Sequence, residues 1–499
     1  MKAFRQYSAT FVCLALLVAI EAPNSNCWAV AVYFTGSTNS DFLTGTNWNP
    51  AGVPGNNLVD VYAIDDGFSS TFSAGSATMQ GLRVGSTAKE HQFGNTHFGR
   101  LTMTGSSLSV IGLYGFNIGR ERENNPFGGD YNKNSIVDAA DYAVWRDTLG
   151  STTDLRADGI PNGTIDQADY DFWRARFGTS VKGGEVIMTG ASTLTANGMV
   201  VGERTKGLLS IGPAALAEVR IWDTTVLPNQ FGGTDDMRVG SYGPAYDDFG
   251  AEPGMDGNGL VDVQGTLNAK DIYLSNNGAK GEIRLSGGNV NLNGALRMNL
   301  CEVCQSDPAL LAQRASKVTI IGSAGSFTIG LDPDPMVLTP TPPPRDLLAA
   351  STTATFSFTA DTGGVTPIVI AQNVLPEPSG TAYIDGANLR INLDAYTSSS
   401  PLTLINAPAL QLIGDFGSIT FLGSRTATPV YDRANGDFRL INFQNGAGAG
   451  TAALAGSAVP EPSSLVLITL ALGLMLLVNY RFDRRTALCR GYQWQRVRA

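Results

Sequence analysis

A glycine-led repeat constrains the fold of this chain more than any other feature. The spacing between two neighbouring repeats is 207 − 184 = 23, and between two others it is 281 − 259 = 22. Within each repeat apolar and polar side chains alternate, as in GEVIMTG and GEIRLSG. Period-2 alternation over short segments that end in glycine predicts β-strands joined by tight turns. The repeats begin at Gly99, Gly184, Gly207, Gly259 and Gly281.

A repeat of this length is typical of a solenoid, in which each coil buries its apolar face against the next coil. We therefore predict a mainly β chain in which residues 32–121 and 182–330 form a β-solenoid of the parallel β-helix type. An antiparallel β-sandwich, which is also built from short strands at regular spacing, is the alternative. The high glycine content favours the solenoid, because glycines recur where the coil corners would lie.

The sequence predicts a second β region after a proline-rich segment. Residues 331–349 are predicted to be a linker, because prolines crowd into this stretch. Five alternating segments follow, among them ATFSFTA and GSITFLG, and predict a smaller all-β module over residues 350–448. Residues 449–458 are rich in glycine and alanine, and are predicted to form a flexible tether.

Both ends of the chain carry targeting signals. Lys2 and Arg5 precede an apolar segment, and a small-x-small pattern ends at Ala31. Residues 1–31 are therefore predicted to be a secretory signal peptide. Near the other end, the apolar residues 465–478 are followed at once by arginines, which predicts a short transmembrane segment with the C-terminus in the cytoplasm.

The C-terminal segment resembles a known bacterial sorting signal. Pro460, Glu461 and Pro462 precede the apolar residues, and basic residues follow them. Residues 459–485 are in this respect similar to the PEP-CTERM signal of exopolysaccharide-producing bacteria, which is also catalogued as an ice-binding protein C-terminal domain. The resemblance implies recognition by exosortase-type sorting machinery, transient anchoring in the membrane, and delivery to the cell envelope or extracellular matrix. A basic tail, residues 486–499, follows the signal.

Cys301 and Cys304 are the only cysteines between the two predicted targeting segments. In an exported protein this C-x-x-C pair predicts a local disulfide. A redox-active pair and half of a zinc site are the alternatives, although the sequence offers no second cysteine pair and no nearby histidine to complete a zinc site.

Residues 122–181 interrupt the repeat with a duplicated acidic segment. DYNKNSIVDAADYAVWRDTLGS begins at Asp130 and DGIPNGTIDQADYDFWRARFGT begins at Asp158, and the two copies align without a gap. In each copy an acidic loop is followed by aromatic residues at helical spacing. The segment therefore predicts two loop–helix units, whose aromatic stripes, which include Trp145 and Trp173, pack against each other.

The two loops fit the pattern of a calcium-binding loop, with oxygen ligands at positions 1, 3, 5, 7, 9 and 12. Calcium is a hard cation that prefers oxygen, so carboxylate and amide side chains at alternate positions suit it. In loop 1 the predicted ligands are Asp130, Asn132, Asn134, the Ile136 carbonyl, Asp138 and Asp141. In loop 2 they are Asp158, Asn162, the Thr164 carbonyl, Asp166 and Asp169. Loop 2 is incomplete, because Ile160 stands at position 3 and its side chain cannot ligate.

Two EF-hand-like loop–helix units with aspartate at position 12 resemble a type I dockerin domain. The resemblance covers residues 128–180 and implies calcium-dependent docking to a cohesin-like partner, usually in assemblies that degrade polysaccharide. That family contacts its partner largely through loop positions 10 and 11, which are often Ser-Thr. Here these positions are Ala139–Ala140 and Gln167–Ala168.

The net charge of the chain and the absence of catalytic motifs exclude some classes of function. The formal net charge of −10 argues against a nucleic-acid partner. Catalysis is not expected, because the sequence holds no G-x-S-x-G motif, no H-E-x-x-H motif, and no basic signature to accompany the acidic Thr234–Asp236 segment. We predict an exported, non-catalytic structural or adhesive protein. A carbohydrate-active enzyme or accessory protein of polysaccharide catabolism, localised by the dockerin-like module, is the alternative.

Overall fold

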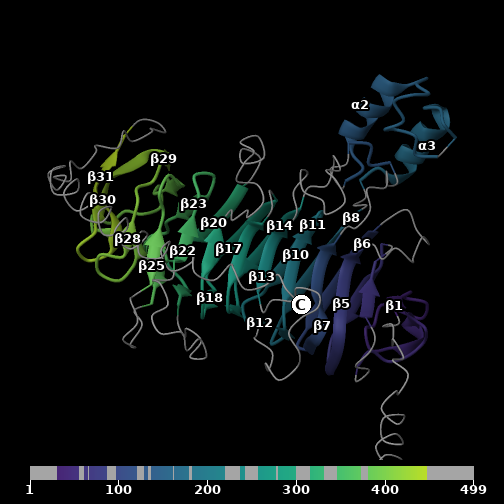
Figure 1. The fold of residues 1–499 in the computed structure, drawn as a ribbon, viewed down its shortest axis with the longest axis horizontal. Coiled ribbons are helices and arrows are strands. Elements are labelled where there is room, and N and C mark those ends of the chain that lie inside the picture. Colours follow the sequence, from purple (N-terminus) through teal and green to yellow (C-terminus); the bar gives the residue numbers. More distant parts are fainter. Residues whose placement is uncertain are drawn as a thin grey trace, which may run out of the picture. The chain divides into compact units, whose positions relative to one another are not determined.

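The structure is a computed structural model, and β-strands dominate it (Figure 1). Its described part also holds the α-helices α2 (Ala139–Thr148) and α3 (Gln167–Arg176) and the short 3-10 helix η1 (Gly45–Asn47). The described residues are 31–55, 61–65, 67–86, 97–120, 129–132, 136–160, 162–178, 182–219, 236–241, 257–276, 279–298, 315–330, 346–371 and 380–446.

Several predicted features lie outside these residues. They are the signal peptide up to residue 30, Asn134, Cys301, Cys304, the tether, the sorting motif Pro460–Glu461–Pro462, the apolar segment behind it and the basic tail. Among the residues that are described, no helix is long and apolar enough to cross a membrane.

One sheet is a ladder of ten parallel strands, which we call the first ladder. Each strand pairs with the strand of the next coil, at a sequence distance set by the repeat. Its strands are β4 (Ser69–Phe72), β6 (His97–Thr104), β8 (Lys182–Thr189), β11 (Lys206–Ile211), β14 (Asn258–Val263), β17 (Lys280–Leu285), β20 (Ala315–Ile321), β23 (Thr355–Thr359), β26 (Asn388–Asn392) and β29 (Ser418–Leu422).

The other sheet contains two further ladders, which the long strands β5 (Ser76–Ser86) and β7 (Ser107–Arg120) join. The second ladder continues through β9 (Thr193–Ala196), β12 (Leu216–Val219), β15 (Thr266–Ala269), β18 (Asn289–Leu292), β21 (Ser326–Ile329), β24 (Ile368–Ile370) and β27 (Leu402–Asn406). The third holds β1 (Ala31–Phe34), β3 (Val61–Ile64), β10 (Met199–Glu203), β13 (Met237–Ser241), β16 (Ile272–Asn276), β19 (Leu296–Met298), β22 (Asp346–Ala350), β25 (Thr381–Tyr383) and β28 (Leu412–Ile413).

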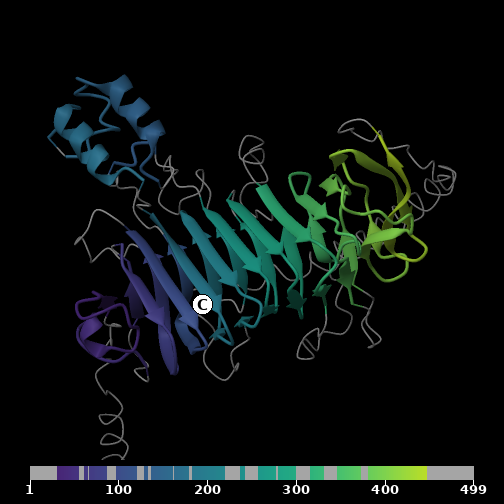
Figure 2. The same cartoon turned by 180° about the vertical axis from the view of Figure 1, so that it is seen from behind.

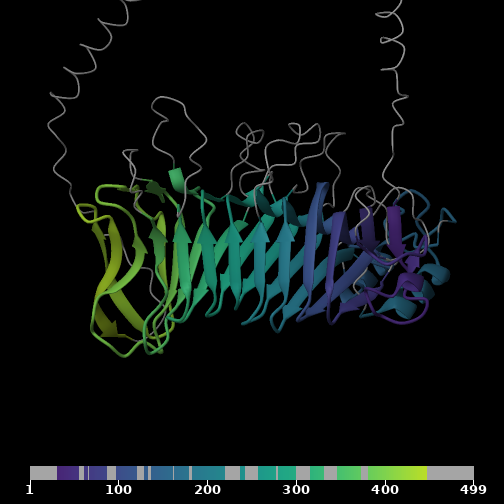
Figure 3. The same ribbon diagram turned by 90° about the horizontal axis from the view of Figure 1, so that it is seen from below.

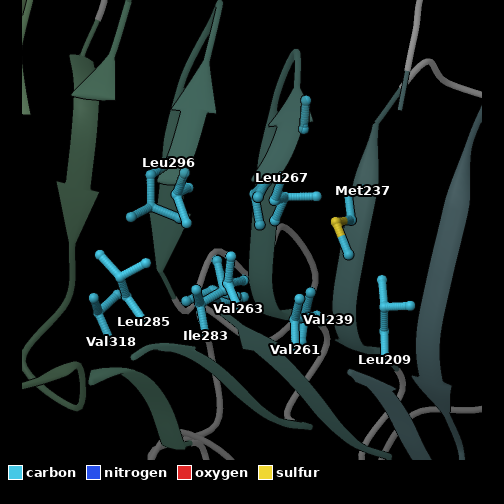
Figure 4. Close-up of a cluster of buried hydrophobic side chains, with 14 of the residues drawn as sticks. Leu209, Met237, Val239, Val261, Val263, Leu267, Ile283, Leu285, Leu296 and Val318 are labelled. Carbon is cyan, nitrogen blue, oxygen red and sulfur yellow. The ribbon is translucent and has the colours of Figure 1, made fainter. Parts of the chain in front are cut away.

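Each coil contributes strands to these ladders, and its apolar side chains point inward. In the first ladder Leu209, Val261, Ile283 and Val318 are aligned by the strand register, and all four are buried. Figure 4 shows these side chains together with Met237, Leu267 and Leu296 of the other two ladders. The alternation read from the sequence is therefore the alternation between core and surface.

The mainly β fold with parallel sheets is confirmed, and it agrees with a β-solenoid. Strands that are distant in the sequence lie side by side in the order of the coils, as Figures 2 and 3 show from two further directions. Among the described strands, antiparallel pairing occurs only between β1 and β2 (Trp48–Asn49) and in the hairpin of β30 (Arg425–Asp432) and β31 (Asp437–Asn445), which pairs with β27. This pattern excludes the antiparallel sandwich.

Two columns of glycine form the corner between the third and first ladders. Gly240 has a φ of +71°, which favours glycine, and a Cβ there would overlap the carbonyl oxygen of Lys280. A Cβ at Gly281 would overlap the carbonyl oxygen of Val239 in the same way. The close approach explains why the repeats begin with glycine. Ser275 holds the corresponding place in β16, with a φ of +60°.

The predicted boundary between a solenoid and a separate C-terminal module is not present. β20 pairs with β23, β21 with β24, and β22 with β25, all in parallel, so residues 346–422 continue the same three ladders. Their apolar side chains belong to the same core. Most of the proline-rich segment lies outside the described residues, and in the sequence it falls between β21 and β22 of one coil, so it does not separate two domains.

Aromatic residues close both ends of the core. At the N-terminal end, Trp48 contacts Phe34, Phe42 and Tyr62 edge to face. At the C-terminal end Phe438 of β31 is fully buried and packs against Phe416 and Tyr431. Terminal coils of a solenoid need such caps, because their apolar face has no further coil to cover it.

Residues 122–181 leave the coils at a corner between the third and first ladders. β6 and β8 pair without a register shift from His97 opposite Lys182 to Thr104 opposite Thr189. Arg120 lies opposite Glu203 and forms an ion pair with it at 2.9 Å. The strands before and after the insertion are therefore in register, as if the chain had passed directly from one coil to the next.

Candidate metal centre

The duplication in the sequence is also a duplication in structure. α2 and α3 begin at equivalent positions of the two copies, Ala139 and Gln167. The aspartates that precede them, Asp138 and Asp166, cap the helices, and their Oδ1 atoms accept hydrogen bonds from the backbone N–H groups two residues further on, at 2.8 and 2.7 Å. Aspartate is a strong N-cap residue, so the predicted position-9 ligands also start the helices.

The position-12 aspartates close their loops from within. Both carboxylate oxygens of Asp141 accept backbone N–H groups, from Asn132 and Asp138, each at 2.8 Å. The equivalent oxygens of Asp169 accept from Ile160 at 3.0 Å and from Asp166 at 2.8 Å. Each carboxylate therefore joins positions 3 and 9 of its own loop.

The two tryptophans bind the loops to each other. The indole N–H of Trp145 in α2 donates to the carbonyl oxygen of Asp166 in loop 2 at 2.8 Å. The indole N–H of Trp173 in α3 donates to the carbonyl oxygen of Asp138 in loop 1 at 3.0 Å. Each helix therefore begins in one loop and holds the position-9 residue of the other.

The predicted aromatic packing is present, and the core around it is small. The rings of Trp145 and Tyr170 have centroids 5.0 Å apart, and those of Tyr142 and Trp173 are 5.5 Å apart. This core is separate from the core of the coils. Its buried members are Tyr131, Val137, Trp145, Ala157, Ile165 and Trp173. A core of this size supplies little stability by itself, so ions are expected to stabilise the module.

Buried carboxylates surround this core. Asp130 is 2% exposed, and Asp141 and Asp169 are completely buried. Burial raises the pKa of Asp141, and burial together with the negative charges of Asp169 and Asp141 raises the pKa of Tyr131. Buried carboxylates are costly unless a cation compensates them.

Three arginines of this module form ion pairs with other aspartates. Arg146 pairs with Asp147, Arg156 with Asp154, and Arg174 with Asp171. These three aspartates are outside the two predicted calcium loops. The predicted ligands Asp141, Asp158, Asp166 and Asp169 take part in none of the ion pairs between described residues.

Loop 2 is held by its own hydrogen bonds. The two oxygens of Asp158 accept the backbone N–H groups of Asn162 and Gly163, at 3.2 and 3.0 Å, and the amide oxygen of Asn162 accepts the N–H of Thr164 at 2.9 Å. Gly163 has a φ of +81°, so a glycine is favoured at this turn. Ile160 is 41% exposed, and its side chain contributes no oxygen.

The residues present suit calcium in donor type, because carboxylate, amide and backbone carbonyl oxygens are the ligands that calcium prefers. In loop 1 hydrogen bonds bring Asn132, Asp138 and Asp141 together at the start of α2, and in loop 2 they bring Ile160, Asp166 and Asp169 together at the start of α3. Each carboxylate oxygen can accept two bonds, so the carboxylates of Asp141 and Asp169 can accept more than the two hydrogen bonds named above. Within the described residues no group of three or more His, Cys, Asp or Glu side chains already forms a metal-binding cluster.

Two kinds of contact were not foreseen from the sequence. Tyr131 has Gly159 as its counterpart in the second copy, and the Tyr131 hydroxyl fills the space beside this glycine and donates to the carbonyl oxygen of Asp169 at 2.7 Å. The tryptophan bonds were also missed, although both copies carry a tryptophan whose buried N–H needs an acceptor. Comparison of the two copies could have indicated the second, because Trp145 and Trp173 are identical.

Comparison with known proteins assigns no family to the chain, so the function has to be inferred from the geometry of the site. No protein-family model, curated protein or solved structure matches the chain.

Proposed function

We propose that residues 129–178 bind calcium and form a dockerin-like module carried by a β-solenoid. The ion would supply positive charge among buried carboxylates. The observation that carries the proposal is the complete burial of Asp141 and Asp169, while the surface arginines named above pair with other aspartates. Calcium would be held in loop 1 by Asp130, Asn132, Asn134, the Ile136 carbonyl, Asp138 and Asp141, and in loop 2 by Asp158, Asn162, the Thr164 carbonyl, Asp166 and Asp169.

The whole protein is proposed to be an exported, non-catalytic structural or adhesive component of the cell envelope or extracellular matrix. The predicted signal peptide and the resemblance of residues 459–485 to the PEP-CTERM signal support this location, and would bring with them exosortase-type processing and a transient membrane anchor. The coils would serve as a support, and the calcium module as the part that contacts a cohesin-like or polysaccharide partner.

Isothermal titration of the full chain with calcium tests the metal site. We expect Asp141→Ala to abolish the tighter of the two sites, since this residue joins positions 3 and 9 of loop 1. Asp154→Ala is the matched control, because Asp154 lies between the loops and pairs with Arg156 at the surface. Equal calcium binding by Asp141→Ala and wild type would refute the ligand assignment.

A second experiment separates the structural role from the enzymatic alternative. The chain is incubated with plant and algal polysaccharides, and new reducing ends and unsaturated products are measured. We expect neither to form, and a partner to be recovered from an envelope extract only when calcium is present. Release of oligosaccharides would instead assign the coils to a carbohydrate-active enzyme.

A further inference from the structure

Three hydrogen-bonding contacts hold each of the position-9 aspartates. The backbone N–H of Asp138 donates to Asp141, its carbonyl accepts from Trp173, and its side chain caps α2. Asp166 makes the same three contacts, with Asp169, Trp145 and the first turn of α3. Of these contacts, only the tryptophan bond crosses from one copy to the other.

We infer that Trp145 and Trp173 are positioning residues that couple the two calcium loops, so that an ion in one loop raises the affinity of the other. An ion in loop 1 fixes Asp138 and Asp141, at the start of α2. The ordered helix then presents the Trp145 N–H to Asp166 of loop 2. By the same steps, an ion in loop 2 orders α3 and presents the Trp173 N–H to Asp138.

The coupling is expected to raise the calcium affinity of loop 2 in particular. This loop lacks a position-3 ligand, so its own affinity is expected to be the lower of the two. Calcium in the complete loop 1 offsets part of the ordering cost of loop 2 through Trp145. Thermodynamic linkage requires the effect to be reciprocal, so loop 2 raises the affinity of loop 1 by the same factor.

If the two indole rings only pack in the core, their substitution changes the calcium affinities of the two loops in a different pattern than if they act through their N–H groups. A tryptophan that only packs would support the loop from which its own helix begins, or both loops equally. A tryptophan that acts through its N–H supports the opposite loop. Phenylalanine keeps an aromatic ring and removes the N–H, so Trp→Phe substitutions separate the two roles.

The experiment is a calcium titration of the full chain with one loop disabled at a time. This inference rests on the proposed function, and wild-type calcium binding is measured first. In the wild-type chain we expect Asp158→Asn, which disables loop 2, to weaken loop 1 about fivefold, the value of one hydrogen bond, and in the Trp173→Phe chain to leave loop 1 unchanged, because the coupling N–H is absent. In the same way, Asp130→Asn disables loop 1 and should weaken loop 2 in the wild-type chain but not in the Trp145→Phe chain. Tyr142→Phe, in the same aromatic cluster, is the control that changes neither site.

A second measurement needs no substitution. In the wild-type chain with one equivalent of calcium, we expect hydrogen exchange of both indole N–H groups to slow together, as followed by NMR. Slowing of one indole alone, or equal effects of both Trp→Phe changes on each loop, would overturn the coupling while leaving calcium binding intact. Absence of calcium binding in the wild-type chain would overturn the proposed function and this inference with it.

Discussion

The backbone of Gly240 lies so close to the carbonyl oxygen of Lys280 that a single methyl group would not fit between them. We expect Gly240→Ala to lower the free energy of unfolding by about 3 kcal/mol or more, since it combines left-handed strain with overlap against a neighbouring coil. Urea denaturation followed by circular dichroism measures the change.

Gly105→Ala, in the turn between β6 and β7, is the matched control for this substitution. Gly105 has a φ of +64°, but a Cβ there meets nothing within 4 Å. It should cost only the left-handed strain, about 1–2 kcal/mol. Equal losses in the two variants would show that close approach at the corner contributes nothing.

Removal of calcium is expected to unfold the inserted module and to leave the coils folded. The module has its own small core, which shares no buried residue with the core of the coils. In excess EDTA, the helical circular dichroism signal should fall and the fluorescence of Trp145 and Trp173 should change, while the β signal persists. Restoring calcium should reverse both changes, and a helical signal that is indifferent to EDTA would contradict the expectation.

Loop 2 is expected to gain affinity when its missing ligand is supplied. Ile160→Asn places an amide oxygen at position 3, and the cost is small because Ile160 is already 41% exposed. We expect the weaker calcium site to tighten by about tenfold, since affinity follows the number of ligands. Ile136→Asn is the control at a residue of similar exposure, 37%, where the backbone carbonyl is the predicted ligand. Its calcium affinity should stay unchanged in the same calorimetric titration.

The C-terminal cap is expected to weaken in strong alkali. Burial raises the pKa of Tyr431 to about 12, against about 10 for an ordinary tyrosine. The folded chain therefore keeps a proton that the unfolded chain loses, so this stabilisation is complete below about pH 10 and disappears as the pH rises through about 12. We expect a loss of about 2 kcal/mol over this interval.

Thermal unfolding as a function of pH checks the cap. Tyr431→Phe should remove the share of this dependence that comes from the C-terminal cap, whereas Tyr383→Phe, at a residue that is 39% exposed, should retain it. A Tyr431→Phe variant that follows the wild-type curve would place the alkaline transition in another part of the chain.

The repeat allowed much of the fold to be predicted. Alternation identified inward residues such as Val186, Ile283 and Leu285, because a parallel strand buries every second side chain whichever coil it belongs to. The glycines at the start of each repeat marked the corners. The sequence did not reveal that Val239 and Lys280, which belong to different coils, supply the carbonyl oxygens against which those glycines lie.

The domain boundary was wrong for a physical reason. Proline excludes a segment from a sheet, but it does so equally in a linker and in a long excursion between two strands of one coil. The pairing of strands across the segment, as between β20 and β23, distinguishes the two cases, and pairing over this separation leaves no local trace in the sequence.

The candidate site was predictable in outline, since the spacing of the loop aspartates and the helices behind them could be read directly. The contacts between the copies were not, because Trp145 and Asp166 meet only when the two units are folded together. The same holds for Tyr131 and Gly159, whose complementary sizes become visible only in space.

The unbroken register between His97 and Lys182 has a wider consequence. The coils on either side of the insertion pair in register with each other. The junction can therefore accept an inserted domain without a change in the strand pairing. A different folded domain could be inserted between Arg120 and Lys182. The same coils would then carry a new binding domain, and their core would need no redesign.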